Sequence, residues 1–459
     1  MIKRLNQIIR RSTAAKAGAV RLPLIAATLV LLPFMSYAEQ RAKKEHRRYK
    51  LIDLGTFGGP SSVFEALAKT INNHGTVVGA ADTPLPDPFA PNCFGPSCFL
   101  QHAFQWQHGV LTDLGALAEG ASSIAAYINE RGDIVGASQN GLVDPLTGVT
   151  EQYAVLWKNG QIINLGALGG SGSIATALNN RGQVVGGAAN TVSDPFSLLG
   201  TFGVPFATQT RAFIWENGVM RDLGTLGGPD SLAWYVNKAG QVSGDSYTDS
   251  TPNDTTGLPT LHSFLWENGR MQDLGSLGGT YSAVDGMNNS GTVVGLMTLP
   301  DDESNHPFLW SQGTLNDLGT LGGDNGEATG VNDAGEACGV ADLPNGLHNA
   351  FSWKHGVMTD LGNLGLTSYA YAINAKGQVV GGSRVSRAPS QISAFLSENG
   401  GPMIDLNTLV PADSPLHLTI ANWINDRGEI AGTGVPPGVS VDDVETAGHA
   451  FVLIPVDDD

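Results

Sequence analysis

A repeat dominates this sequence from Tyr49 onward, with copies spaced about 43 to 60 residues apart, a period typical of solenoids and propellers. In the copy at 262–295, two short runs of β-forming residues flank Asn268-Gly269, the strongest short hairpin signal. A second pair flanks Asn288 to Gly291, where Asn opens a type I turn and Gly takes the left-handed position. Each unit therefore predicts two hairpins, or four short strands.

Three marks of the unit each occur eight times. A turn asparagine is followed three residues later by glycine at Asn72, Asn129, Asn179, Asn237, Asn288, Asn332, Asn374 and Asn425. Segments resembling Asp-Leu-Gly begin at Asp53, Asp113, Asn164, Asp222, Asp273, Asp317, Asp360 and Asp405. The third strands hold Phe104, Val155, Phe213, Phe264, Phe308, Phe351, Phe395 and Phe451.

The two ends of the repeat region are complementary halves of one unit. Residues 49–55 match a fourth strand without its first three, and residues 449–454 match a third strand without a fourth. If they pair, Ile52 lies beside Val452 and the ring has no open edge, whereas an open solenoid would need polar caps. We therefore predict an all-β, eight-bladed β-propeller of four-stranded antiparallel blades. It forms one domain over 49–459, closed by the N-terminal strand joining the C-terminal blade.

The units resemble the HAF repeat of bacterial extracellular proteins, named after the tripeptide seen at His102-Ala103-Phe104 and His449-Ala450-Phe451. The resemblance covers essentially the whole region after residue 48 and implies a repeat architecture, with no shared catalytic motif to transfer. Tyr153, Arg211 and Asn349 replace the histidine in other units, which argues against a chemical role for it.

The N-terminal residues 1–38 have the pattern of a signal peptide. They hold six of the 25 Lys and Arg, no acid, and the apolar run 22–34, which is too short to cross a bilayer core of about 30 Å. We predict cleavage after Ala38, a linker over 39–48, and a secreted or periplasmic protein without a membrane span after cleavage. An uncleaved membrane anchor is the alternative.

Without that segment the chain carries 19 Lys and Arg against 43 Asp and Glu, a net charge of −24. Nucleic acid and anionic membranes are therefore not expected as partners, because phosphate contacts need cations. Cations, neutral glycans and basic proteins remain open, and we expect a monomer. Cys93 and Cys98 lie close together in a Pro/Gly-rich loop and predict a disulfide; a metal pair is the alternative, although no second pair completes it. Cys338 is expected to be a buried small hydrophobe.

Residues three positions before each turn asparagine do not repeat. If that strand is innermost, these residues are candidates to line a central channel and bind a ligand, or to form only a wetted channel wall. They are Lys69, Ala126, Thr176, Trp234, Asp285, Thr329, Tyr371 and Asn422.

Long insertions separate the second and third strands of the first four units, and they are expected on one face, where variable loops carry recognition. They span 80–101, 137–152, 187–210 and 245–261. Three contain Asp-Pro followed by Phe89, Leu146 or Phe196, interpreted as a turn with a hydrophobic anchor, or as a contact surface. The fourth holds Asp245, Asp249, Asn253 and Asp254, a calcium candidate or simply a solvated loop; no other cofactor is expected.

The repeated histidines and aspartates are expected to be structural, because a ring disperses equivalent positions beyond the reach of one metal or one catalytic pair. We therefore favour a non-catalytic binding protein that uses the long-loop face for an extracellular ligand or protein. The alternative is a hydrolase or lyase acting on a glycan or lactone at the channel mouth, for which two carboxylates within about 6 Å would argue. A third hypothesis is an acidic matrix component stabilised by calcium.

Overall fold

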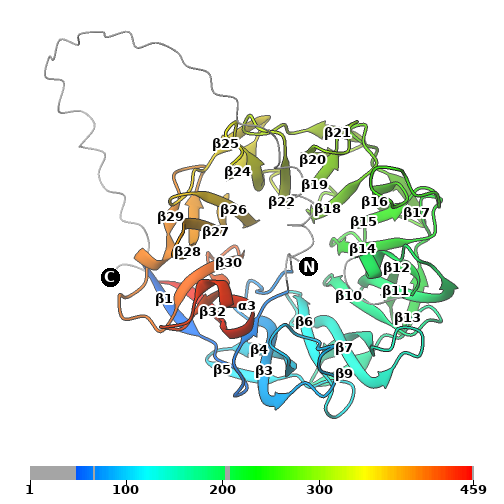
Figure 1. Cartoon of the computed structure of the whole chain (residues 1–459), viewed down its shortest axis with the longest axis horizontal. Helices are drawn as coiled ribbons and strands as arrows, with labels where there is room; N and C mark the ends of the chain where they lie inside the picture. The colour runs from blue at the N-terminus through cyan, green and yellow to red at the C-terminus, as the bar shows by residue number, and fades with distance from the viewer. Residues whose placement is uncertain (1–47, 66–67, 202–206, 457–459) are drawn as a thin grey trace, which may run out of the picture.

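The computed structural model describes residues 48–65, 68–201 and 207–456, and these form eight four-stranded sheets arranged as blades around a ring (Figure 1). Neighbouring strands within each sheet are antiparallel, so the predicted eight-bladed propeller is confirmed. We name the blades A to H. Blade A contains the first and the last strand of the chain, and blades B to H follow in chain order.

Within each blade, the four strands follow one another from the centre of the ring outward (Figure 1). The innermost strands are β2 (Ser62–Val63), β6 (Ser123–Ile128), β10 (Ser173–Leu178), β14 (Ser231–Val236), β18 (Ser282–Met287), β22 (Gly326–Val331), β26 (Thr367–Ile373) and β30 (His417–Ile424). The second strands are β3 (Val77–Pro86), β7 (Ile134–Val143), β11 (Val184–Ser193), β15 (Val242–Tyr247), β19 (Val293–Thr298), β23 (Ala337–Asp342), β27 (Gln378–Arg387) and β31 (Ile430–Val435).

The third and fourth strands complete each blade on its outer side. The third strands are β4 (Phe99–Gln107), β8 (Thr150–Lys158), β12 (Thr208–Glu216), β16 (Leu261–Glu267), β20 (Asn305–Ser311), β24 (His348–Lys354), β28 (Ser390–Glu398) and β32 (His449–Val456). The fourth strands are β5 (Val110–Asp113), β9 (Gln161–Asn164), β13 (Val219–Asp222), β17 (Arg270–Asp273), β21 (Thr314–Asp317), β25 (Val357–Asp360), β29 (Ile404–Asp405) and β1 (Arg48–Asp53). The described part of the chain also has four short helices in its connections: α2 (Leu198–Thr201), η1 (Leu406–Thr408), η2 (Val441–Asp443) and α3 (Val444–Ala447).

Ring closure takes the predicted form. Strand β1 pairs antiparallel with β32, and Ile52 lies directly opposite Val452. Across the same joint, Nδ1 of His449 lies 3.1 Å from a carboxylate oxygen of Asp53. The paired strand begins at Arg48, one residue before the predicted boundary, and the predicted signal peptide (1–38) lies outside the described residues, as does the linker except for its last residue.

The core repeats one contact in every blade. The third-strand residue, Phe in seven blades and Val155 in blade C, is completely buried. It lies opposite a second-strand glycine, as in the pair Gly295 and Phe308. A Cβ at Gly295 would lie 1.9 Å from the backbone oxygen of Ala283, because a β-bulge brings the innermost strand close to the second strand at this point. The glycine therefore permits a close approach between strands that no larger residue allows.

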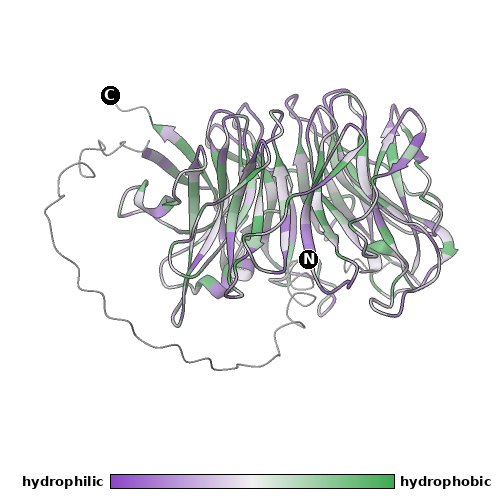
Figure 2. Ribbon diagram, turned by 90° about the horizontal axis from the view of Figure 1, so that it is seen from above, coloured by the Kyte–Doolittle hydropathy of each residue, from purple (hydrophilic) through white to green (hydrophobic). Residues whose placement is uncertain are grey.

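We call the two sides of the ring the turn face and the loop face, and Figure 2 shows the strands running between them. The turn face carries the hairpin turns between first and second strands and between third and fourth strands. The loop face carries the second-to-third connections and the crossovers to the next blade.

On the turn face, the eight turn asparagines form a closed ring of hydrogen bonds. The Nδ2 group of each donates to the backbone oxygen of the equivalent asparagine in the next blade, and Asn425 closes the circle by donating to Asn72. The Oδ1 atom of each accepts from backbone N–H groups of its own turn, as Asn288 does from Ser290 and Thr292. One buried amide thus orders its own turn and also joins two blades.

The expected loop insertions are mostly longer strands. In blades B, C and D the second strand has 10 residues and the third has 9, which leaves shorter connections than the sequence suggested. Blade E keeps short strands and a true loop at 248–260. Blade H has the same 10- and 9-residue strands, although its sequence does not contain one of the long insertions. Its connection has only two residues, Ala388 and Pro389, and strand lengthening leaves no loop-like composition to recognise.

Candidate functional site

Most of the predicted channel residues occupy one structural position. In blades C to H and A, the residue three before the turn asparagine is the extra residue of a β-bulge in the innermost strand, as Thr176 is between Ala175 and Ala177. A bulge leaves its residue outside the regular ladder. Lys69 comes after the described part of β2, and its Nζ lies 2.5 Å from Glu130 of blade C.

Several of these side chains contact the next blade. The hydroxyl of Thr176 donates to the backbone oxygen of Ala233, and that of Thr329 donates to Ala370. Asp285 and Thr329 are buried, and Asn422 has a buried, unbonded Oδ1 atom. Trp234 and Tyr371 remain partly exposed. The set is therefore in part an inter-blade joint.

The structure brings Asp285 together with acidic and phenolic groups of four consecutive blades, E to H. The Asp285 carboxyl is hydrogen-bonded to that of Glu327 in β22. Glu327 in turn accepts from the Tyr369 hydroxyl of β26 at 2.9 Å, and the Tyr369 ring lies 4.8 Å from that of Tyr371. On the other side, the Tyr235 hydroxyl donates to the Asp285 backbone oxygen at 2.6 Å. Sequence reasoning missed Glu327, Tyr369 and Tyr235, because they do not occupy the bulge position.

Burial controls the protonation of this cluster. Burial raises the pKa of Asp285 well above its usual range, and the nearby carboxylates Glu327 and Asp245 raise it further. The pKa of Glu327 is raised by burial but lowered by the hydrogen bonds from Tyr369 and Asp285. Two carboxyls in contact cannot both ionise without a large energetic cost, so Asp285 keeps the proton and donates a hydrogen bond to the Glu327 carboxylate.

Asp245, predicted as a calcium ligand, instead lies in β15 and is completely buried. It accepts hydrogen bonds from Trp234 Nε1 at 2.8 Å and from the hydroxyl of Ser263 at 3.0 Å, and burial raises its pKa to about 7. Asp249 accepts from the N–H of Thr251 in the following loop, which also contains Asp254 and Asn253. Within the described residues, no three His, Cys, Asp or Glu side chains are grouped as metal ligands.

The repeated histidines pair with the repeated aspartates on the outer strands. Nδ1 of His102, His262 and His306 lies 2.8 to 2.9 Å from the carboxylate of the aspartate in the adjacent fourth strand. The same aspartates accept from the backbone N–H two residues later, as Asp273 does from Gly275 at 2.7 Å. In other blades, Arg211 and Asn349 make the contact in place of histidine. These residues hold the blade edge together, as the sequence suggested.

The long hairpins of blades B, C and D present apolar residues at their tips. Nine large hydrophobic side chains are strongly exposed among the described residues, and five of them lie here. Leu85, Leu142 and Val192 occupy equivalent positions, two residues before the aspartate that follows each strand, with exposed fractions of 58%, 61% and 51%. Val143 and Leu146 extend the set in blade C.

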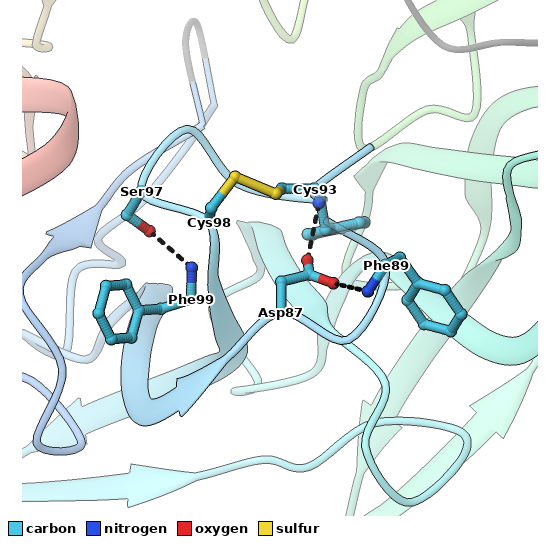
Figure 3. The surroundings of a disulfide bond; sticks show 7 residues. Asp87, Phe89, Cys93, Ser97, Cys98 and Phe99 are labelled. Atoms are coloured by element: carbon cyan, nitrogen blue, oxygen red, sulfur yellow. Dashed lines mark hydrogen bonds between the residues drawn. A yellow bond between two sulfur atoms is a disulfide. The ribbon is translucent and has the colours of Figure 1, made fainter. Parts of the chain in front are cut away.

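The aspartates below these tips form tight turns. Asp87, Asp144 and Asp194 are buried, and each accepts from the backbone N–H two residues later. Figure 3 shows the Asp87 turn beside the Cys93–Cys98 disulfide, with a Cα–Cα distance of 5.2 Å, so the predicted disulfide is present. The expected hydrophobic anchor exists for Phe196, which packs on a buried cluster, but Leu146 is 70% exposed and anchors nothing.

A second carboxyl pair lies on the loop face of blade D. Asp194 is hydrogen-bonded to Asp230, and burial raises the pKa of Asp230 to about 8. The other oxygen of Asp230 accepts from the N–H of Leu198 in α2 at 2.7 Å. The sequence contained no signal for this pair, because its members are 36 residues apart and only the folded crossover brings them together.

Eight radial blades closed by strands from both chain ends define a β-propeller. Solved structures resemble the chain at low sequence identity. The β-propeller domain of the Trilobed protease from Pyrococcus furiosus is 10% identical, with 78% of this chain and 98% of that chain covered and a TM-score of 0.42. TolB from Acinetobacter baumannii is 12% identical, with 71% and 80% covered and a TM-score of 0.34.

An acylaminoacyl peptidase from Pyrococcus horikoshii is 11% identical, with a TM-score of 0.41; 84% of this chain is covered, but only 58% of the peptidase. No protein-family model matches the chain, and no curated protein matches it either. These likenesses concern the fold alone. In the part of the chain that the structure describes, no helix has the length and apolar character needed to span a membrane.

Proposed function

We propose that the chain is a non-catalytic binding propeller of the HAF-repeat type, exported to the periplasm or cell exterior, whose loop face contacts an extracellular ligand or protein. The observation that carries the proposal is the clustering of exposed apolar residues at the hairpin tips of blades B to D. Large apolar side chains projecting from neighbouring elements are typical of interaction sites.

Charge supports the same surface. The chain has a net charge of −18, and −24 without residues 1–38, so long-range attraction favours a neutral or basic partner. Close contact then needs apolar area, which the three tips provide at equivalent positions. A partner that spans Leu85, Leu142 and Val192 would bury all three at once.

The experiment replaces the three tip residues together, as L85S/L142S/V192S, and measures binding to arrays of glycans and to envelope proteins. The matched control is V110S/V219S/V357S, because these valines are 51 to 62% exposed but lie on the turn face of blades B, D and G. We expect the tip variant to lose at least tenfold in affinity and the control to keep it. Equal binding by the two variants would refute the choice of the loop face.

A second candidate function is a hydrolase or lyase at the channel, and the hydrogen-bonded carboxyls of Asp285 and Glu327 favour it. A protonated and an ionised carboxyl in contact provide an acid and a base. The contact is closer than the separation of about 5 to 9.5 Å used by most glycosidases, so a lyase-type proton transfer suits the pair better. Screening glycans and lactones with wild type, D285N and E327Q tests this; activity that survives in both variants excludes the pair.

A further inference from the structure

A separate cavity of about 470 Å³ lies on the loop face between blades G and H, and its lining is basic. It is formed by His348 at the start of β24, by Leu366 and Thr367 at the start of β26, and by Arg384 and Arg387 of β27. Cavities of about 300 to 1,000 Å³ suit small ligands. In a chain with 43 acids and 25 basic residues, a cavity lined by two arginines and no acid is unusual.

The long hairpin of blade H explains how both arginines reach one cavity. Residues three apart in a regular strand point to opposite faces of the sheet. The pairing of β27 with β28 shifts register between Arg384 and Ser386, and this irregularity reverses the alternation before Arg387. The unexpected lengthening of this hairpin therefore places the second arginine beside the first.

Within the described residues, neither guanidinium group has a carboxylate partner of its own. Arg384 donates to the hydroxyl of Ser390 at 3.0 Å, and Ser390 donates to Asp442 at 2.9 Å, so Asp442 reaches Arg384 only through a hydroxyl. Among the described residues, no ion pair within 4.0 Å includes either arginine. Burial and the charge of Arg384 lower the pKa of His348, while Asp342 opposes that shift.

We propose that this cavity binds an oxyanion, the carboxylate or sulfate of a sugar-sized acidic ligand. A guanidinium group presents a planar fork of donors that matches two oxygens of such a group, and two forks meet here. The Thr367 side chain lies in the same wall, and Leu366 supplies an apolar surface for the carbon frame of a sugar. None of the cavity's lining residues belongs to the hairpin tips of blades B to D, so the site does not depend on the function proposed above.

Calorimetric titration of the full chain with sodium glucuronate, sodium sulfate and glucose tests the proposal. We expect saturable binding of glucuronate, of sulfate, or of both, and none of glucose. R384Q should weaken anion binding at least tenfold, and R387Q by a smaller factor because Arg387 is exposed. R270Q is the matched control, because it removes the same charge from the exposed start of β17.

Binding of a single anion identifies the group that the cavity prefers, and supports the proposal. If R384Q fails to fold, R384K replaces it, because it keeps the charge but loses the fork of donors; its affinity should fall below that of wild type. No saturable binding of either anion, equal binding of glucose, or full affinity in folded R384Q and R387Q overturns the proposal. None of these results changes what L85S/L142S/V192S would show, so the two proposals fail separately.

Discussion

The turn face and the loop face of the ring are held together by different chemistry. On the turn face, eight neutral asparagine amides make the same hydrogen bond from blade to blade, including the bond from Asn425 to Asn72 that crosses the joint between chain ends. On the loop face and in the channel, two joints are acidic and occur once each: Asp194 with Asp230, and Asp285 with Glu327.

This difference separates the turn face, whose contacts close the ring, from the loop face, where residues and hairpin lengths differ between blades. A contact repeated eight times constrains every unit equally, because the loss of one turn asparagine interrupts the circle of hydrogen bonds. Near the loop face, a serine at or near the start of the first strand accepts from a third-strand N–H of the preceding blade in six pairs of blades. The hairpins of that face do not follow a repeat, because they differ in length, apolar tip or charge. Recognition is therefore expected on the loop face, and the following predictions compare the two faces directly.

The largest effect is expected on the turn face. Asn288→Ala removes the bond to the Asn332 backbone oxygen at 2.9 Å and leaves two N–H groups of its own turn without their acceptor. Buried groups left unbonded cost about 1 to 3 kcal/mol each, so we expect a loss of about 2 to 4 kcal/mol in the free energy of unfolding, measured in urea.

Asn253→Ala is the loop-face control for that measurement. Asn253 also orders its own turn, by accepting from Thr255 and Thr256, and its Nδ2 group donates to Leu258 and Thr280, but it lies half-buried in the connection of blade E. We expect a loss of about 1 kcal/mol, since water replaces exposed hydrogen bonds. Equal losses in the two variants would show that the asparagine ring contributes nothing beyond an ordinary turn.

The repeat explains why the fold was predictable while the site was only partly so. Asn288 and Gly291 are local turn signals, and eight copies with complementary ends leave few closed arrangements. Asp285 was a candidate because it departs from the repeat. Its partner Glu327 lies 42 residues away and two residues before Thr329, the candidate position of its own unit. Arg384 and Arg387 were missed because a β-bulge, which has no sequence signature here, places them together.

An intermediate effect is expected from pH on the loop face. The folded pKa of Asp230 is about 8, against about 3.9 for an unfolded aspartate, so the folded chain binds more protons between these values. The free energy of unfolding therefore falls as pH rises from about 4 to 8, by at most about 1.4 kcal/mol per pH unit for one proton.

Asp230→Asn should flatten this slope, because the amide donates to Asp194 without titrating. Urea unfolding at several pH values between 5 and 8 measures it, and part of the slope should remain through Asp245 and Asp285, whose pKa values are also raised. Asn288→Ala is the neutral comparison, and its loss should be the same at every pH. Parallel curves for wild type and Asp230→Asn would mean that the Asp194–Asp230 pair does not hold a proton.

The smallest effect on folding is expected from the exposed apolar residues of the two faces. Leu142 is 61% exposed at a loop-face tip, and Val357 is 62% exposed at a turn-face hairpin. Because neither side chain is buried, L142S and V357S should each change the free energy of unfolding by less than about 0.5 kcal/mol. Because the two variants should be equally stable, any difference in partner binding between them shows which face binds the partner and does not reflect a difference in folding. Loss of binding in V357S with full binding in L142S would reverse the assignment of the recognition face, and with it the idea that freedom from the repeat marks where this propeller makes its contacts.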